Sequence, residues 1–322
     1  MIIPTLLGIT IMVFAVSRVA PGDPVSLAMG PGGQLDAERA ADVREARMRL
    51  YGLDKPVHVQ YWVWLKRITR LDFGDSIKYH RPVIELIKVK LPITLMLNII
   101  AFVIIYAVSL PLGVLTAVKH KQFLDRASSV ALFMLWSLPS MWVGQMLIGY
   151  LCGPTFFNWF PPAGLSSNYA EQLAFFPWLG DRLWHLVLPV TCLTYAGFAY
   201  LTKQVRAGML DSLRADYVRT ARAKGLSNTV VIFRHAFRNS VIPVITIMAT
   251  LLPAMLAGSV IIERIFSIPG MGLLAFEAVT TRDYNVVMAV ATIGGVLNLA
   301  GLLLADIAYA IADPRISFES TV

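Results

Sequence analysis

Residues 92–118 read PITLMLNIIAFVIIYAVSLPLGVLTAV, a run that contains no charged side chain. A bilayer core about 30 Å thick needs about 20 apolar residues of helix, because every backbone polar group must be hydrogen-bonded within the span. This run therefore predicts a membrane-spanning helix. Five further stretches are apolar enough for the same prediction, namely 2–20, 127–152, 185–203, 241–262 and 286–311. The expected fold is an all-α integral membrane protein with about six transmembrane helices.

The composition of the whole chain supports this fold class. Hydrophobic residues make up 57% of the 322 residues, charged residues 15%, and the mean hydropathy is +0.64. A water-soluble domain averages about 25% charged residues, so this chain lacks the polar surface of a cytosolic enzyme or a disordered regulator. Cys152 and Cys192 both lie in apolar stretches and are interpreted as buried small hydrophobes. A disulfide scaffold is excluded as well.

Prolines fall inside three of the expected spans, at Pro111, Pro139 and Pro253. In a membrane, neighbouring helices can satisfy the carbonyls that a proline frees, so these prolines do not argue against the three spans.

The first span, 1–20, leaves two interpretations open. It is short and ends in small residues, as a cleavable signal peptide does, but Arg18 interrupts the expected cleavage position and favours a membrane anchor. Met1 begins the apolar run directly, without the basic flank that either segment should have, and we expect the true start to lie a few residues upstream.

Basic residues in the loops predict the orientation. Lys119, Lys121 and Arg126 lie between the second and third spans, and eight basic residues lie in 203–238. The loops 153–184 and 263–285 together carry only three. The positive-inside rule places the first two loops and both termini in the cytoplasm. These loops also explain much of the net charge of +8, so a nucleic-acid partner is not expected.

The segment 21–91 is then extracytoplasmic and is expected to be folded. Val57, Tyr61, Leu65 and Ile68 recur at helical spacing, with tryptophans among them. This pattern predicts an amphipathic helix resting on the membrane surface or on its own bundle. A second helix is expected over 36–50, ended by Gly52.

Catalytic motifs are missing from the sequence. No Gly-Lys dipeptide occurs, so the phosphate cradle of a P-loop ATPase is absent. No HExxH or GxSxG motif occurs, and the five histidines are scattered. Ionisable residues are nearly absent from the spans, Asp306 being the main exception, which disfavours an ion-coupled carrier. We therefore expect a non-catalytic protein without a metal site or cofactor.

The segment 204–240 is expected to form a helix, a glycine turn and a second helix. Asp211 or Ser212 could cap the first helix, and Gly225 could end it. The first helix would present one face made of Leu213, Tyr217 and Ala221, and the second would start at Ser227 or Asn228 and run through His235 to Arg238. Its arginines could orient a protein partner through carboxylate contacts. The alternative is a basic loop that only contacts anionic lipid headgroups.

The stretches 219–226 (RTARAKGL) and 234–239 (RHAFRN), followed by Ile242-Pro243, resemble the cytoplasmic coupling loop of ABC-importer permeases of the peptide and nickel subfamily. The general family pattern has Glu-Ala-Ala at these three positions. This chain has Arg219-Thr220-Ala221 there, which is also the sequence of peptide-type members. Further matches follow in order along the chain, namely 21–24 (PGDP), 52–56 (GLDKP), 73–76 (FGDS), 91–94 (LPIT), 258–260 (GSV), 269–272 (PGMG) and 313–315 (DPR).

The resemblance implies the permease of a type I ABC importer in a bacterial or archaeal cytoplasmic (inner) membrane. Residues 1–20 would be the first helix, 21–91 the extracytoplasmic segment and 92–322 a core of five transmembrane helices. The implied partners are two ATP-binding cassette subunits, a second related permease, an extracytoplasmic solute-binding protein and membrane lipid. The implied ATPase-coupling residues are Arg219, Thr220, Ala221, Arg222, Ala223, Lys224, Gly225, His235 and Arg238.

The resemblance implies di- or oligopeptides as substrate. Nickel or another small solute is the nearest alternative, and a self-sufficient secondary carrier is a more distant one. Polar residues within the spans could line the pathway, although each could equally make an ordinary helix-to-helix hydrogen bond. They are Asn98, Gln145, Thr191, Thr194, Tyr195, Thr246, Thr250 and Asn298.

Overall fold

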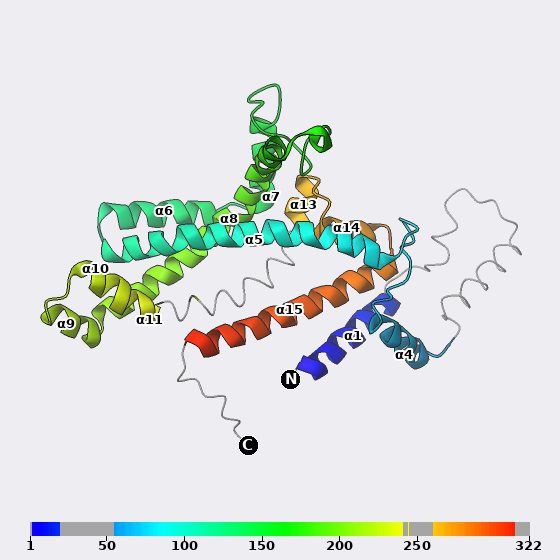
Figure 1. Ribbon diagram of the computed structural model, residues 1–322, viewed down its shortest axis with the longest axis horizontal. Helices are drawn as coiled ribbons and strands as arrows, with labels where there is room; N and C mark the ends of the chain where they lie inside the picture. The colour runs from blue at the N-terminus through cyan, green and yellow to red at the C-terminus, as the bar shows by residue number, and fades with distance from the viewer. Residues whose placement is uncertain (1, 20–54, 241–243, 245–259, 313–322) are drawn as a thin grey trace, which may run out of the picture. The chain divides into compact units, whose positions relative to one another are not determined.

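The computed structural model describes residues 2–19, 55–240, 244 and 260–312 (Figure 1). These residues are helical with connecting turns, and contain no strand beyond an isolated bridge between Asp75 and Pro82. The all-α prediction is confirmed. The helices are α1 (Ile2–Val19), α4 (Val57–Ile68), α5 (Val83–Val118), α6 (Phe123–Ser137), α7 (Ser140–Leu151), η1 (Ala170–Gln172), α8 (Phe175–Arg214), α9 (Asp216–Ala223), α10 (Asn228–Val230), η2 (Val231–Phe237), α11 (Arg238–Ser240), α13 (Val260–Ile265), α14 (Met271–Thr280) and α15 (Tyr284–Ala312).

Three described helices, α5, α8 and α15, are long and apolar enough to cross a membrane, and α6 with α7 would make a fourth as one broken span. Helix α5 continues through Pro111, as expected. It begins at Val83, before the predicted span 92–118. Most of the fifth predicted span, 241–262, and the expected helix over 36–50 lie outside the described residues.

The predicted span 127–152 is broken at Pro139 into α6 and α7, which together can still form one span. Helices α6 and α7 meet there at 91°. Proline has no N–H and disfavours helical geometry in the preceding residue, and Leu138 is accordingly extended (φ −85°, ψ 125°). The Tyr195 hydroxyl of α8 donates a hydrogen bond of 2.6 Å to the Leu138 carbonyl. A tertiary contact therefore satisfies a backbone group at the break.

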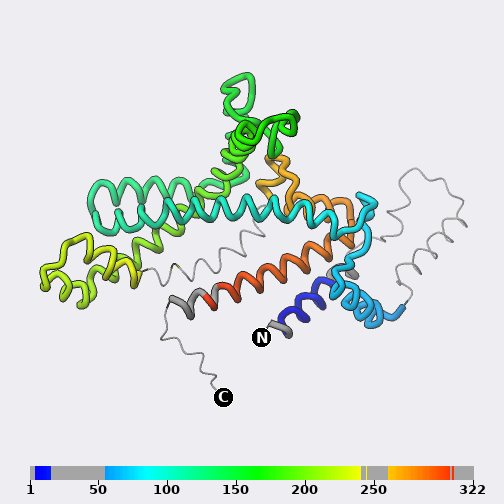
Figure 2. Tube along the Cα trace, viewed as in Figure 1, coloured from blue at the N-terminus to red at the C-terminus, as the bar shows by residue number. Residues whose placement is uncertain are grey.

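The chain divides into two compact units. The first comprises 1–93 and 269–297, and within it α4 lies against α1 (Figure 2). The buried side chains of its core come from the start of α5, from α14 and from the start of α15, and include Val83, Ile87, Leu274, Val286 and Ala289.

A polar network ties the 76–79 turn of this unit to α14 and to Asp283, the residue before α15. Asp283 is buried and accepts hydrogen bonds from the Ser76 hydroxyl (2.5 Å) and from the Lys78 backbone N–H (3.2 Å). The Lys78 ammonium lies 2.8 Å from a Glu277 carboxylate oxygen, to which the Tyr79 hydroxyl also donates. Burial alone would raise the pKa of Glu277, but these two hydrogen bonds outweigh it and hold that pKa below its ordinary value of 4.5.

This network predicts an acid-sensitive contribution to stability. Because the pKa of Glu277 is lowered in the folded protein, the contribution is present above the ordinary pKa of 4.5 and is lost as the pH falls through the folded value. Glu277→Gln should lower the melting temperature at neutral pH, and its difference from the unmodified chain should shrink below pH 4.5. Thermal melts from neutral pH to below pH 4.5 test this prediction. Glu85→Gln, at an exposed position of α5, is the control. A difference that is constant with pH would contradict the assignment.

The second unit comprises 94–268 and 298–322, and α8 is its central helix, in contact with α6, α7, α11 and α13. Helices α5 and α8 approach closely at Gly113, where a Cβ would lie 2.6 Å from the Val205 Cβ and 3.1 Å from the Thr202 carbonyl oxygen. Any side chain here would have to push the two helices apart.

Gly113→Ala should therefore lower the free energy of unfolding by about 1–3 kcal/mol, the usual cost of overpacking. The matched control is Gly149→Ala in α7, where a Cβ would meet nothing within 4 Å. That substitution should be neutral or slightly stabilising, because alanine favours helix over glycine. Denaturation of the purified protein in detergent compares the two, and equal effects would refute close packing at Gly113.

Candidate functional site

The segment 204–240 starts on the last turns of α8. Val205, Met209 and Ser212 continue the buried face of α8 at helical spacing, so this helix runs on to Arg214. Ala215 then leaves helical geometry (φ −70°, ψ 150°), and α9 begins at Asp216. The expectation that Asp211 or Ser212 caps a separate helix is therefore wrong, because burial of Ser212 keeps it within α8.

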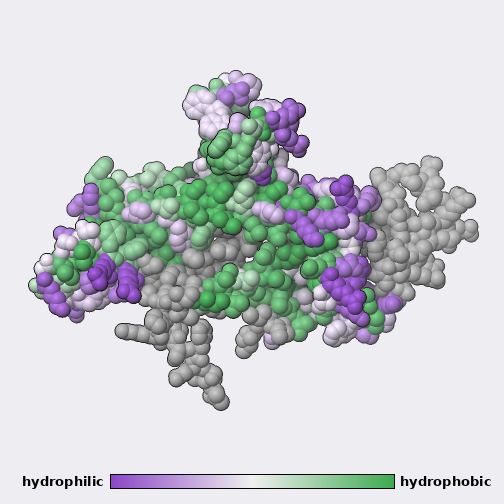
Figure 3. Space-filling model, viewed as in Figure 1, coloured by the Kyte–Doolittle hydropathy of each residue, from purple (hydrophilic) through white to green (hydrophobic). Residues whose placement is uncertain are grey.

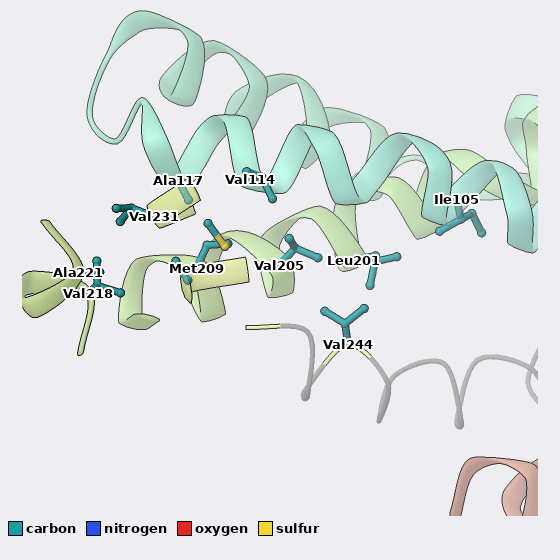
Figure 4. Packing of buried hydrophobic residues seen from close by; sticks show 11 residues of the cluster. Ile105, Val114, Ala117, Leu201, Val205, Met209, Val218, Ala221, Val231 and Val244 are labelled. Carbon is teal, nitrogen blue, oxygen red and sulfur yellow. The ribbon is translucent and has the colours of Figure 1, made fainter. Parts of the chain in front are cut away.

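Helix α9 is held down by Val218 and Ala221, which are both buried (Figure 4). They belong to the same core cluster as Met209 of α8 and Val231 of η2. Tyr217 is instead 39% exposed, so the predicted face of Leu213, Tyr217 and Ala221 is correct only in part. Val218 is buried in place of Tyr217, because α9 starts at Asp216 and this start determines which residues face the core.

Gly225 ends α9 as predicted, with the positive φ of +77° that favours glycine. The Gly225 N–H donates to the Arg222 carbonyl (2.9 Å), and the Leu226 N–H donates to the Ala221 carbonyl (3.4 Å). This is the Schellman pattern that satisfies the last carbonyls of a helix. The glycine thus fixes the direction in which the chain leaves α9.

The second half of the segment begins at Ser227, as predicted, although its side chain makes no capping hydrogen bond. Short α10 leads into the π-helical turn η2, followed by α11. A π-helical turn is rare and often occurs at functional sites. Val231 and Ala236 of η2 are buried in the cluster that holds α9. Sequence periodicity missed these anchors, because a π-turn shifts the usual spacing of buried positions.

The face opposite this core is polar and basic. Of the nine predicted coupling residues, Ala221 is buried and His235 is half-buried, whereas the other seven are exposed, namely Arg219, Thr220, Arg222, Ala223, Lys224, Gly225 and Arg238. Figure 3 shows hydrophilic surface gathered at α9 to α11. Asp216 lies 3.4 Å from Arg219, but both side chains are highly exposed and this pair adds little stability. The exposed surface of the segment is therefore mainly polar and basic, with Phe233 and Leu226 as exposed apolar side chains.

An ion pair holds the base of the segment. The Arg206 guanidinium of α8 contacts both carboxylate oxygens of Asp125 in α6, at 2.6 and 2.8 Å. The Lys121 backbone N–H donates to the same carboxylate (2.8 Å), and His120 Nδ1 lies 3.1 Å from the guanidinium. Asp125 is buried. This cluster links the α5–α6 turn to α8 shortly before α9 begins, and Arg206 is one of the eight basic residues in 203–238.

The predicted pathway residues that the structure describes have varied surroundings. Gln145 and Asn298 are exposed, whereas Asn98, Thr194 and Tyr195 are buried. The Thr191 and Thr194 hydroxyls donate hydrogen bonds to backbone carbonyls of their own helix. The Tyr195 hydroxyl donates to the Leu138 carbonyl. The Asn98 amide makes no hydrogen bond within the described part of the chain. Thr246 and Thr250 lie outside the described residues. A pathway role for these residues stays a prediction.

Family comparisons agree with the architecture. Residues 109–318 match the family described as binding-protein-dependent transport system inner membrane component, and residues 1–98 match the N-terminal region of such membrane components. The chain belongs to this permease family. Its role is therefore that of a membrane permease component of ABC importers, as the resemblance implied.

Relatives of the permease family match along nearly the whole chain. The oligopeptide transport system permease protein AppB of Bacillus subtilis (strain 168) is 42% identical over 99% of this chain and 97% of its own length. The inner membrane ABC transporter permease protein YejB of Escherichia coli O157:H7 is 35% identical, with the same two coverages.

A solved chain of the methionine ABC transporter MetNI, in an inward-facing conformation, has a similar fold. Its TM-score is 0.53 at 14% identity, and the match covers 71% of this permease and 97% of that chain. At this identity the likeness concerns the fold alone. It supports the assignment of an ABC-importer permease fold to the described helices. Among the described residues, no group of three or more His, Cys, Asp or Glu side chains could hold a metal ion.

Proposed function

We propose that this chain is the permease subunit of an ATP-driven importer of di- or oligopeptides in a bacterial or archaeal cytoplasmic membrane. The observation that carries the proposal is the 42% identity, over nearly the full length of both chains, to an oligopeptide transport system permease. ATP is hydrolysed on two separate ATP-binding cassette subunits. A second, related permease and an extracytoplasmic solute-binding protein complete the assembly.

The segment 204–240 is the part that receives force from the ATPase. Its exposed basic side chains suit the carboxylates of a partner protein. Its buried side chains Val218 and Ala221 belong to one core with residues of α5 and α8. A partner that displaces α9 therefore also displaces α8. A nucleotide-driven shift between two transporter conformations requires the partner to contact this segment differently in the two conformations.

In the proposed orientation 204–240 and both termini are cytoplasmic, and thiol labelling tests the placement of 204–240. Lys224→Cys and Glu171→Cys each place a thiol on an exposed position, in a chain lacking the native Cys152 and Cys192. A membrane-impermeant maleimide should label Glu171→Cys in intact cells and Lys224→Cys only after the membrane is opened. The reverse pattern would invert the topology and remove the segment from the ATPase side.

The same two variants test docking on the ATPase. In the intact assembly, a thiol-to-amine cross-linker should join Lys224→Cys to an ATP-binding subunit and leave Glu171→Cys unjoined.

Reconstitution then tests the transport reaction. Labelled oligopeptide should enter vesicles only with ATP, the ATPase subunits and the binding protein. Uptake by the permease alone along an ion gradient would show a secondary carrier, and ATP-driven uptake of nickel without peptide would change the substrate.

A further inference from the structure

The turn between α5 and α6 lies beside the segment 204–240. Ala117, on the last turn of α5, is buried in the core cluster that also contains Val218 of α9 and Val231 of η2 (Figure 4). The turn begins two residues after Ala117. Residues 119–126, which we call the basic turn, therefore border the surface that we assign to ATPase docking.

The outer side chains of the basic turn are basic and aromatic. Lys119, Lys121 and Arg126 are exposed, and Phe123 is 86% exposed. The carboxylate of the turn, Asp125, is already held by the guanidinium from α8. None of the three exposed cations pairs with a carboxylate among the residues that the structure describes. An excess of positive charge around an exposed aromatic ring suits a partner surface that combines carboxylates with an apolar pocket.

The backbone of the basic turn is held in a fixed conformation. Lys121 has φ +64°, which is uncommon for a residue with a side chain. Its N–H donates to the Asp125 carboxylate (2.8 Å), and the Gln122 N–H donates to the Lys119 carbonyl (3.0 Å). Such a conformation persists only where its surroundings hold it. A preordered turn loses little conformational entropy when it docks on a protein, whereas attraction to lipid headgroups needs only charge near the surface.

We propose that the basic turn is a second docking element for the ATP-binding cassette subunit, with Phe123 as an apolar anchor and its three exposed cations as contacts to carboxylates. Two observations favour this occupant. The basic turn shares a core with the segment 204–240, and both present basic residues beside an exposed phenylalanine, which in the segment is Phe233 (58% exposed). One acidic partner surface can therefore cover both. The inference rests on the proposed function, because it assumes that the segment docks on the ATPase.

Photo-cross-linking in the intact assembly tests this inference, in a chain lacking the native Cys152 and Cys192. Gln122→Cys, Lys224→Cys and Met134→Cys, all at exposed positions, each carry a benzophenone attached to the thiol. Irradiation should join the ATP-binding subunit to Gln122→Cys and to Lys224→Cys. It should not join that subunit to Met134→Cys, which lies near the other end of α6.

The outcomes separate this inference from the proposed function. Cross-linking through Lys224→Cys but not through Gln122→Cys would overturn the second docking element and leave the proposed function standing. Cross-linking of Gln122→Cys to lipid or to another subunit would also overturn it, because the basic turn would then have a different occupant. If neither variant joins the ATP-binding subunit, the proposed function fails together with the inference.

Subunit exchange tests the anchor. In the assembled transporter, Phe123→Ala should speed the replacement of labelled by unlabelled ATP-binding subunit on the order of tenfold, as the loss of an aromatic anchor does. Phe176→Ala, at an 82% exposed position at the start of α8, is the matched control and should leave the rate unchanged. Because Phe123 is exposed, its replacement should leave the melting temperature unchanged, which excludes a folding defect. An unchanged exchange rate in Phe123→Ala would contradict its role as an anchor.

Discussion

Gly225→Val should abolish uptake through the assembled transporter while leaving the amount of permease in the membrane nearly unchanged. Gly225 has φ +77°, a conformation that costs a residue with a side chain about 1–2 kcal/mol and is worst for a β-branched residue. The strained residue would release the Leu226 N–H from the Ala221 carbonyl and redirect the chain leaving α9. The basic face that we assign to ATPase docking would then lose its fixed position.

A graded series separates backbone strain from side-chain size at Gly225. A Cβ at this position would meet nothing within 4 Å, so room is not the constraint. Asparagine tolerates positive φ, and uptake should therefore decrease from Gly225→Asn through Gly225→Ala to Gly225→Val. Uptake normalised to the permease content of membranes is the measurement, and Gly180→Val in α8, where space is equally open, is the control.

Two outcomes would contradict this account of Gly225. If all three variants lose uptake equally, a partner surface requires the absence of any side chain. If Gly225→Val fails to insert, the glycine acts in folding and not in coupling.

Local composition was enough to predict the longest helices. The apolar runs predicted α1, α5, α8 and α15, because spanning a bilayer demands length and hydrophobicity that can be counted along a single segment. Gly225 was predictable for a similar reason, since the turn conformation it adopts depends mainly on its own missing side chain.

Distant residues decide the features that the sequence did not predict. Whether Pro139 bends or breaks a helix depends on a partner for the freed carbonyls, and Tyr195 of α8 supplies one. Ser212 is a good helix cap by itself, but the tertiary core keeps it within α8. The pairing of Asp125 with Arg206 joins residues 81 positions apart, and nothing local indicates it.

Asp125→Asn should be among the most damaging single substitutions in the described part of the chain. The Asp125 side chain is 5% exposed and that of Arg206 is 26% exposed, so the substitution leaves a partly buried guanidinium without its counter-charge. Breaking a fully buried pair typically costs about 3–5 kcal/mol, and the partial exposure of Arg206 makes the low end of that range the expected cost. We expect a lower melting temperature in detergent and a loss of uptake larger than the loss of protein, because the pair links α6 to the helix that carries α9.

A matched pair of variants shows whether this effect comes from the buried ion pair itself. Asp216→Asn also removes an aspartate from an arginine, but at Asp216 and Arg219 the two side chains are 95% and 73% exposed, and the change should be within about 0.5 kcal/mol. Adding Arg206→Gln to Asp125→Asn removes the stranded charge. The double variant should therefore be more stable than the sum of the two single losses predicts.

If the double variant recovers stability without recovering uptake, the ion pair positions the segment 204–240 as well as stabilising the fold. Neutral polar partners can restore packing at that place, but they lack the two-point contact by which Arg206 fixes α8 to α6. Full recovery of uptake would show that the pair serves stability alone. Additive losses would contradict the direct coupling that its geometry implies.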